Sequence, residues 1–234
     1  GPYVGLSRRF SRLRFHRPDF ARMASAIRPF KYPSDCFGQS LGGAIIHFGN
    51  AFQQGDEVIV DGMFQDNFEA NDTLADVFNT TGRFGGGWYR RYRLNMKTGD
   101  LHTEQVSDVE SEFPTFNNEF LGTKNNVTYT ACSVDNGANS FFNAISRVSF
   151  DGQADVVTLP PGFYGSEPLF VPKSNAKKED DGYLMEVVYN GFEHNSELLI
   201  FRADDISDQV CSLKLKHHVP HQFHGFYTPE VFAS

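Results

Sequence analysis

The fold is decided by the stretch AISRVSFDGQADVVTL, which runs from Ala144 to Leu159. Two runs of apolar and β-branched residues flank Asp151-Gly152, a dipeptide that favours the tight turn of a β-hairpin. Glycine takes the positive φ that such a turn requires without a steric penalty. The stretch therefore predicts two antiparallel strands joined by a turn.

The same pattern continues on both sides of this hairpin, because short apolar runs alternate with turn residues from His47 onward. One further hairpin is predicted around Gly99, between Trp88–Leu94 and Leu101–Val106. A helical pattern covers only Asp72–Phe78. Evenly spaced short strands predict an all-β sandwich, barrel or propeller. The other predicted strands are Glu57–Gly62, Val127–Cys132, Tyr183–Tyr189, Glu197–Phe201 and Val210–Leu215.

Composition limits the class of protein. The chain has 234 residues, is 40% hydrophobic and contains 24 phenylalanines, which excludes wholesale disorder and suits one domain or a piece of a larger one. A net charge of −8 gives no electrostatic basis for binding nucleic acid. Cys36, Cys132 and Cys211 are odd in number and widely spaced, which argues against a disulfide framework or a structural zinc site. We expect a reducing intracellular compartment.

The first 32 residues differ from the rest of the chain. They contain seven arginines and one acidic residue, Asp19, which is the composition of an organelle transit peptide. A cloning or gene-model artefact explains them equally well. We expect this segment to lie outside the fold, and the protein to be cytoplasmic, or in a plastid or another organelle if the segment is a transit peptide.

Two histidines and two glutamates lie in apolar surroundings and form the candidate site. His47 and His224 lie near the two ends of the strand-rich region, and Glu112 and Glu167 lie between them in proline-marked segments. Burying an imidazole without a partner is costly, whereas imidazoles backed by carboxylates are typical of metal sites. Two alternatives remain open. Each histidine can be a core residue with a satisfied ring, and the two glutamates can be a glycosidase pair.

Five motifs in order strengthen the metal hypothesis, because together they resemble the carotenoid cleavage oxygenases over about residues 44 to 232. The family includes carotenoid-, apocarotenoid- and stilbene-cleaving dioxygenases and the retinoid isomerohydrolase. The motifs are His47–Phe52, Ser111–Pro114, Ser166–Pro172, Glu179–Tyr183 and Val219–Gly225.

The resemblance implies a seven-bladed β-propeller with Fe(II) on its axis, held by four histidines, three of which donate hydrogen bonds to glutamates. Matched by motif, His47 and His224 correspond to the third and fourth iron ligands, and Glu112 and Glu167 to two of the glutamates. The implied function is cleavage of a conjugated C=C bond of a carotenoid, apocarotenoid or stilbene with O₂. An apolar substrate of this kind is compatible with peripheral membrane contact, and an oligomer is also compatible with the resemblance.

The sequence also departs from the family. Complete members are considerably longer, so residues 44–234 are expected to be the C-terminal half of the propeller domain. Nothing in residues 1–44 matches the first two histidine ligands or the third glutamate, since His16 lies in an arginine-rich stretch. Gln53 replaces an acidic residue that often follows the Asn50-Ala51-Phe52 run. We expect a truncated gene or partial gene model, or else a shortened pseudo-enzyme. The alternative function is a non-catalytic propeller-type binding module without a complete iron site.

Overall fold

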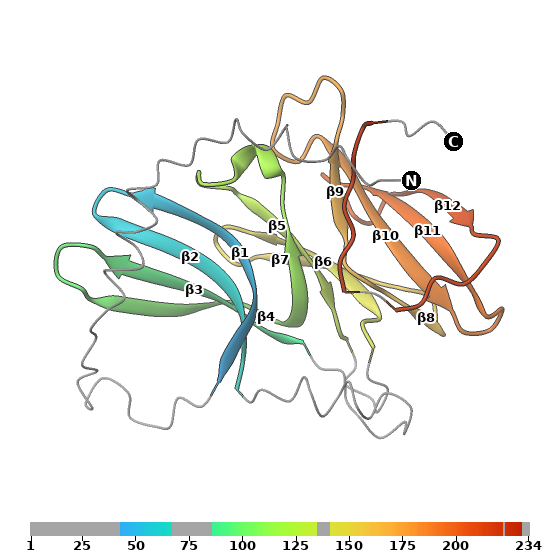
Figure 1. Cartoon of the computed structure of the whole chain (residues 1–234), viewed down its shortest axis with the longest axis horizontal. Coiled ribbons are helices and arrows are strands. Elements are labelled where there is room, and N and C mark those ends of the chain that lie inside the picture. The colour runs from blue at the N-terminus through green and yellow to red at the C-terminus, as the bar shows by residue number, and fades with distance from the viewer. Residues whose placement is uncertain (1–42, 67–85, 135–140, 222, 231–234) are drawn as a thin grey trace, which may run out of the picture. The chain divides into compact units, whose positions relative to one another are not determined.

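The computed structural model describes residues 43–66, 86–134, 141–221 and 223–230 (Figure 1). The chain divides into two compact units, Gly1–Leu41 and Gly42–Ser234, and all the described residues belong to the second. The arginine-rich start and the helix expected at Asp72–Phe78 therefore lie outside the described residues. None of the helices in the described ranges has the length and apolar character needed to cross a bilayer.

The described part of the chain is almost entirely β-structure, which confirms the predicted fold class. A single 3₁₀ turn, η1 (Asn118–Phe120), accompanies the strands. The strands are β1 (Ala44–Gln54), β2 (Glu57–Gln65), β3 (Gly87–Asn95), β4 (Leu101–Thr115), β5 (Val127–Cys132), β6 (Ala144–Ser149), β7 (Ala154–Thr158), β8 (Phe163–Tyr164), β9 (Leu169–Pro172), β10 (Gly182–Asn190), β11 (Asn195–Arg202) and β12 (Gln209–Lys214).

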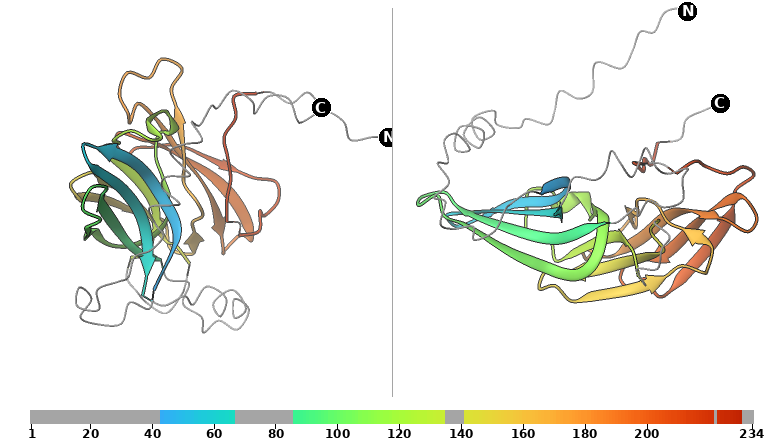
Figure 2. Two further views of the ribbon diagram at one scale, coloured as in Figure 1. Left: turned by 60° about the vertical axis from the view of Figure 1, so that its left-hand side comes forward. Right: turned by 90° about the horizontal axis from the view of Figure 1, so that it is seen from below.

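The strands form two antiparallel sheets. One sheet has the order β1-β2-β3-β4-β5-β6-β7, and the other has the order β12-β11-β10-β8, with β9 also paired to β10. Strand β4 is long enough to serve two neighbours: most of its length pairs with β3, and Ser111–Thr115 extends along β5. Both sheets are built from antiparallel strands that mostly follow one another in sequence, which is consistent with part of a β-propeller (Figures 1 and 2).

Both predicted hairpins are present. The β6–β7 pair runs in register from Ala144 opposite Thr158 to Val148 opposite Ala154, and Gly152 in its turn has a φ of 91°. The β3–β4 hairpin turns at Gly99, whose φ is 80°. In both turns the glycine occupies the left-handed region that other residues avoid, which is why the two glycines located the turns correctly.

The largest hydrophobic core lies between the β5–β6 region and the strands β10 and β11. Tyr129 and Ile145 meet Leu184, Val188 and Phe201 there, and all five side chains are buried. The Tyr129 hydroxyl donates a 2.9 Å hydrogen bond to a backbone carbonyl beyond β11, that of Ala203. This core therefore attaches the second sheet to the first, and the attachment brings the two halves of the candidate site within reach of each other.

A buried ion pair supports the β2–β3 pair. The guanidinium of Arg91 donates two hydrogen bonds to the Asp61 carboxylate, at 2.8 and 3.1 Å, and the Tyr89 hydroxyl donates a third at 2.8 Å. The guanidinium also donates a 2.6 Å hydrogen bond to the Phe150 carbonyl and stacks 3.7 Å above the Phe150 ring. Its Nη1 atom lies 3.8 Å from Glu104 Oε1. Both carboxylate oxygens of Asp61 therefore accept hydrogen bonds, as buried polar groups usually do.

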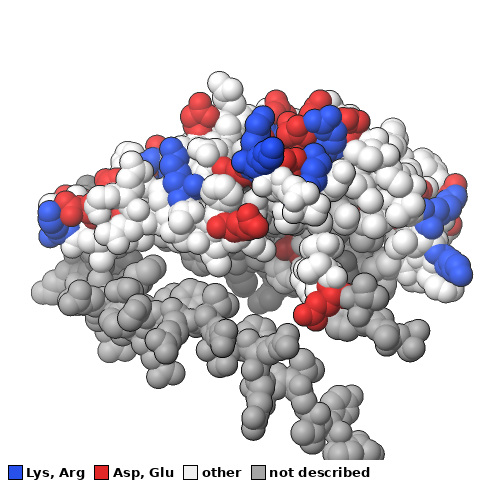
Figure 3. All heavy atoms as spheres, turned by 90° about the horizontal axis from the view of Figure 1, so that it is seen from above, with Lys and Arg blue, Asp and Glu red and all other residues white. Residues whose placement is uncertain are grey.

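Charged side chains of both signs are interspersed on the surface. On the face shown in Figure 3, Lys and Arg lie among Asp and Glu instead of gathering into a single-sign patch.

Candidate metal centre

The first half of the site comes from strands β1 and β4. The His47 ring nitrogen Nδ1 lies 2.7 Å from Glu112 Oε2, and the Glu112 side chain is only 6% exposed. Both residues lie at irregularities in their strands. Two residues, Ile46 and His47, lie opposite Met63 alone, and β4 has a similar register shift just after Glu112. Bulges of this kind re-aim side chains next to functional sites.

The second half comes from the segment before β9 and the segment after β12. His224 Nδ1 lies 3.2 Å from Glu167 Oε1, and the Gly225 backbone N–H donates to Glu167 Oε2 at 2.8 Å. Glu167 thus holds both the ring and the backbone of the His224 segment. The sequence interpretation that His224 is buried is wrong, since its side chain is 58% exposed. The segment that carries it has no regular strand, so neighbouring strands do not enclose it.

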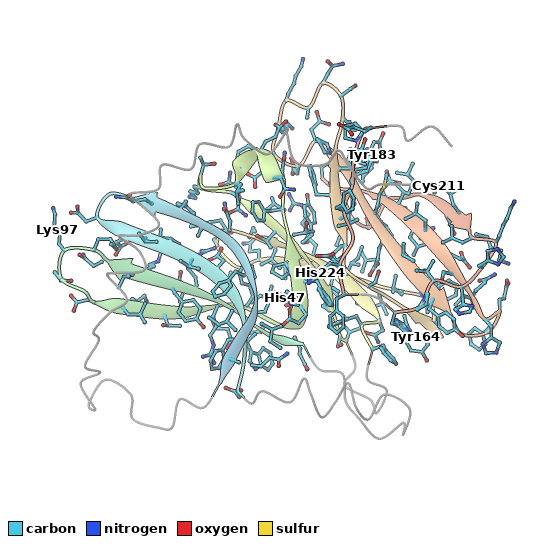
Figure 4. The ribbon with its side chains drawn as sticks, in the orientation of Figure 1. His47, Lys97, Tyr164, Tyr183, Cys211 and His224 are labelled. Carbon is cyan, nitrogen blue, oxygen red and sulfur yellow. The ribbon has the colours of Figure 1, made fainter. Side chains whose placement is uncertain are left out.

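The two imidazoles meet edge to face. Their Nε2 atoms are 3.3 Å apart, the ring centroids are 5.0 Å apart and the ring planes are inclined by 82°. Figure 4 labels the two residues close to each other, His47 on β1 and His224 on the C-terminal segment. The structure therefore brings together all four residues predicted from the sequence. Each histidine lies beside one glutamate, and the two histidines contact each other.

The carboxylates determine which imidazole nitrogens remain free. A carboxylate beside Nδ1 favours the tautomer with hydrogen on that nitrogen, which leaves the lone pair on Nε2. In neutral His47 and His224, the two Nε2 lone pairs then face each other and cannot form a hydrogen bond. A cation between them resolves this conflict, because both lone pairs can bind it.

The separation of the two nitrogens suits a shared metal ion. Zinc, a first-row metal, holds imidazole nitrogen at about 2.0–2.1 Å, so two such ligands on one ion lie roughly 2.8–3.4 Å apart at angles of about 90–110°. The observed 3.3 Å falls in this interval. Neutral imidazole suits iron, zinc, copper and nickel. Within the described ranges, no group of three or more His, Cys, Asp or Glu residues could hold a metal, so the described residues offer two ligands.

The ring of Phe113 packs against both imidazoles, and the sequence interpretation missed this residue. Its ring centroid is 4.9 Å from that of His47 and 5.8 Å from that of His224. The residue is buried and has a φ of 55°, in the left-handed region. Only its place inside the Ser111–Pro114 motif pointed to it.

A buried carboxyl group supports the Glu167 segment, and it too was missed. Glu186 Oε1 accepts a hydrogen bond from the Ser166 N–H at 3.2 Å, while the Ser166 hydroxyl donates to the Val187 carbonyl at 2.6 Å. Burial raises the pKa of Glu186 to about 8, although the Ser166 hydrogen bond lowers it. The alternation of Leu184, Glu186 and Val188 was the available signal, because it places the three residues on one face of β10.

Comparison with known proteins gives a consistent picture. The family model described as retinal pigment epithelial membrane protein matches residues 36–229. The apocarotenoid-15,15'-oxygenase of Synechocystis sp. is 29% identical over 187 residues, which are 78% of this chain and 38% of that protein. The carotenoid 9,10(9',10')-cleavage dioxygenase of Crocus sativus is 30% identical over 232 residues, or 91% of this chain and 40% of that protein.

Solved structures agree. A chimera of the Synechocystis oxygenase and the retinal pigment epithelial protein superimposes with a TM-score of 0.73 at 28% identity, covering 80% of this chain and 40% of that one. The cobalt-substituted Synechocystis oxygenase gives a TM-score of 0.68 at 25% identity, covering 78% and 39%. The chain therefore spans about two fifths of the length of the relatives that it matches.

Proposed function

The chain belongs to the carotenoid cleavage oxygenase family, and on this premise we propose that it supplies part of the iron centre of a dioxygenase that cleaves a carotenoid or apocarotenoid. The proposed overall reaction converts one conjugated C=C bond and one O₂ into two carbonyl groups. Carotenoids are chosen over stilbenes because the two relatives described above are named for carotenoid and apocarotenoid cleavage. Because the chain spans only part of those proteins, activity and substrate are proposals for the complete protein.

One observation carries the proposal: two imidazole Nε2 atoms lie 3.3 Å apart, and the opposite nitrogen of each ring lies beside a carboxylate. His47 and His224 would hold the metal through these Nε2 atoms. The chemistry that ferrous iron supplies at such a site, when bound, is the activation of O₂ toward an alkene. A cobalt-substituted relative is known as a structure, which supports a divalent first-row metal as the occupant.

The remaining residues have separate roles. Glu112 and Glu167 hold the Nδ1 hydrogens, which keeps the Nε2 lone pairs available and places negative charge near a cation. Phe113 provides an apolar wall beside both rings. Phe48 and Phe226, adjacent to the two histidine segments, are 61% and 82% exposed and offer apolar contacts to a polyene.

The test is metal content after anaerobic reconstitution with Fe(II), measured by elemental analysis on the chain and on three variants. We expect His47→Ala and His224→Ala to lose the iron that the unaltered chain retains. His102→Ala removes an exposed histidine of β4 and serves as the matched control, which should keep its iron.

Two outcomes would contradict the proposal. Iron retained in full by His224→Ala would show that the metal binds elsewhere. Iron at background in the unaltered chain would favour the alternative of a non-catalytic binding module. Where iron binds, the loss of polyene absorbance on adding an apocarotenoid and O₂ tests the reaction itself.

A further inference from the structure

Phe113 lies at a β-bulge with an unfavourable backbone conformation. Between the pairs Glu112–Ala131 and Thr115–Tyr129, strand β4 has two residues where β5 has one. Phe113, the first of the two, has a φ of 55°. A bulky residue rarely occupies this region, and a residue that precedes proline, as Phe113 precedes Pro114, is further restricted to extended conformations. Such strain persists only where the surroundings enforce it, often at functional sites.

The bulge changes which side chains reach His47. In a regular strand, successive side chains point to opposite faces. Here the successive residues Glu112 and Phe113 both contact the same imidazole, the carboxylate through Nδ1 at 2.7 Å and the phenyl ring at a centroid distance of 4.9 Å. The left-handed residue brings both side chains to one face.

The backbone of Phe113 also fixes the carboxylate. Its N–H donates a 3.0 Å hydrogen bond to Glu112 Oε2, the same oxygen that lies beside His47 Nδ1. The other oxygen, Oε1, is buried and has no hydrogen-bond partner among the described residues. One oxygen is therefore selected and aimed by the bulge. The ring of Phe113 also packs nearly perpendicular to His224, at an interplanar angle of 84°.

We propose that the left-handed bulge at Phe113 is the positioning device of this site: it aims Glu112 at His47 Nδ1 and holds the Nδ1–H tautomer that frees Nε2. The inference deepens the proposed function and rests on it for the identity of the occupant. The aiming itself is a property of the chain and can be measured without metal.

The test separates backbone conformation from the loss of the phenyl ring. Phe113→Gly and Phe113→Ala both remove the ring, but only glycine accepts a positive φ freely. We expect Phe113→Gly to have a folded-to-unfolded ratio roughly fourfold higher than that of Phe113→Ala, because the left-handed penalty of about five- to thirtyfold for a residue with a Cβ exceeds the two- to fivefold entropic cost of glycine. Phe201 in β11 is also buried and has no positive φ. At that position the folded-to-unfolded ratio of Phe201→Ala should exceed that of Phe201→Gly by roughly two- to fivefold.

The second readout is the tautomer of His47, obtained from long-range ¹H–¹⁵N correlation spectra of the metal-free chain. The unaltered chain and Phe113→Gly should show hydrogen on Nδ1, whereas Phe113→Ala should show a mixture of tautomers. If neither small variant folds, Phe113→Asn and Phe113→Leu provide a pair of similar size. Asparagine enters the left-handed region more readily, so it should preserve the Nδ1–H tautomer better than leucine.

The inference is wrong if alanine equals glycine at position 113 in both stability and tautomer, or if the unaltered chain lacks the Nδ1–H tautomer. Failure of the proposed function would look different. The glycine and alanine variants would differ as expected, while Co(II) added as the probe would bind none of the chains.

Discussion

Two carboxylates determine the chemistry of the site at the scale of single residues. Glu112 and Glu167 each lie beside the Nδ1 of one imidazole, so that the opposite nitrogens face each other with free lone pairs. The arrangement requires each imidazole to carry its ring hydrogen on Nδ1. The carboxylate beside Nδ1 favours that tautomer, which the imidazole would not hold by itself. In the proposed metal centre the histidines supply the lone pairs, and the glutamates keep those lone pairs available.

Replacing either carboxylate with an amide should weaken metal binding. We expect Glu112→Gln to lower Co(II) affinity by about 10- to 100-fold, the usual effect of losing a partner behind a ligand. Glu167→Gln should have the smaller effect, because its contact is longer, at 3.2 Å against 2.7 Å, and the histidine it holds is more exposed. Calorimetric titration measures both. Glu119→Gln, at an exposed position of η1, is the control, and equal affinities in all four proteins would refute the assignment.

Glu186 should make stability depend on pH. Its carboxyl is neutral at low pH in both states, and the folded state keeps its proton up to about pH 8, whereas the unfolded chain releases it near 4.5. The folded state therefore binds more protons between these values, and stability falls as pH rises through this window. From pH 5 to pH 8 the penalty grows by about 3 kcal/mol.

Glu186→Gln should remove that loss. Urea unfolding at pH 5 and pH 8 measures the free energy of unfolding of both proteins. The difference in favour of the variant should be larger at pH 8 than at pH 5. Glu57→Gln, whose side chain is 42% exposed, should leave the pH slope as it is. Parallel slopes in the unaltered chain and Glu186→Gln would mean that the Glu186 carboxyl is already ionised in the fold.

At the scale of elements, turn chemistry and alternation were enough to predict most strands. Asp151-Gly152 and Gly99 marked hairpins because the turns need positive φ, and β10 and β11 lie at two of the predicted apolar runs. The bulges could not be predicted in this way. Phenylalanine before proline disfavours a left-handed conformation, so the conformation of Phe113 follows from its contacts across strands and not from its local sequence. Three strands, β1, β8 and β9, were missed. Pairing with β10 defines β8 and β9, and β1 pairs with β2 through two register shifts that interrupt its alternation.

The same limit applies to the site. Its four residues were identified by motif, but their distances depend on how the β10–β12 sheet packs against β5 and β6. The exposure of His224 also depends on tertiary structure, because apolar neighbours in the sequence do not ensure burial in a segment without strands.

The pairing of β2 with β3 should depend on a buried ion pair. Asp61→Ala leaves the Arg91 guanidinium, whose side chain is 4% exposed, without its main partner. Breaking a buried pair in this way costs about 3–5 kcal/mol. Asp56→Ala removes the exposed partner of Lys97 and should cost less than about 1 kcal/mol. Chemical denaturation compares the two variants, and a similar small cost in both would show that Arg91 finds another partner.

At the scale of the whole molecule, the described part of the chain exposes several large apolar side chains. Phe226 is 82% exposed, Phe48 is 61% exposed, and Val210 and Leu213 of β12 are about half exposed. Exposed apolar groups and an exposed strand promote association. In a closed propeller, strand edges are short and protected.

The isolated chain should therefore associate or melt with low cooperativity. Light scattering coupled to size exclusion should show species larger than the monomer, and Phe226→Ser should shift the distribution toward the monomer. Lys97→Ser, at an exposed turn, is the control. A monodisperse monomer with a sharp thermal transition would instead indicate an independently stable fold.

The most direct measurement is an anomalous difference map from crystals of the chain grown anaerobically with Fe(II), with data collected at the iron edge. We predict one strong peak bonded to both His47 Nε2 and His224 Nε2, with Glu112 and Glu167 still beside the Nδ1 atoms. No peak at that position, or iron bound elsewhere while the two Nε2 atoms still face each other, would contradict the assignment of these histidines as metal ligands.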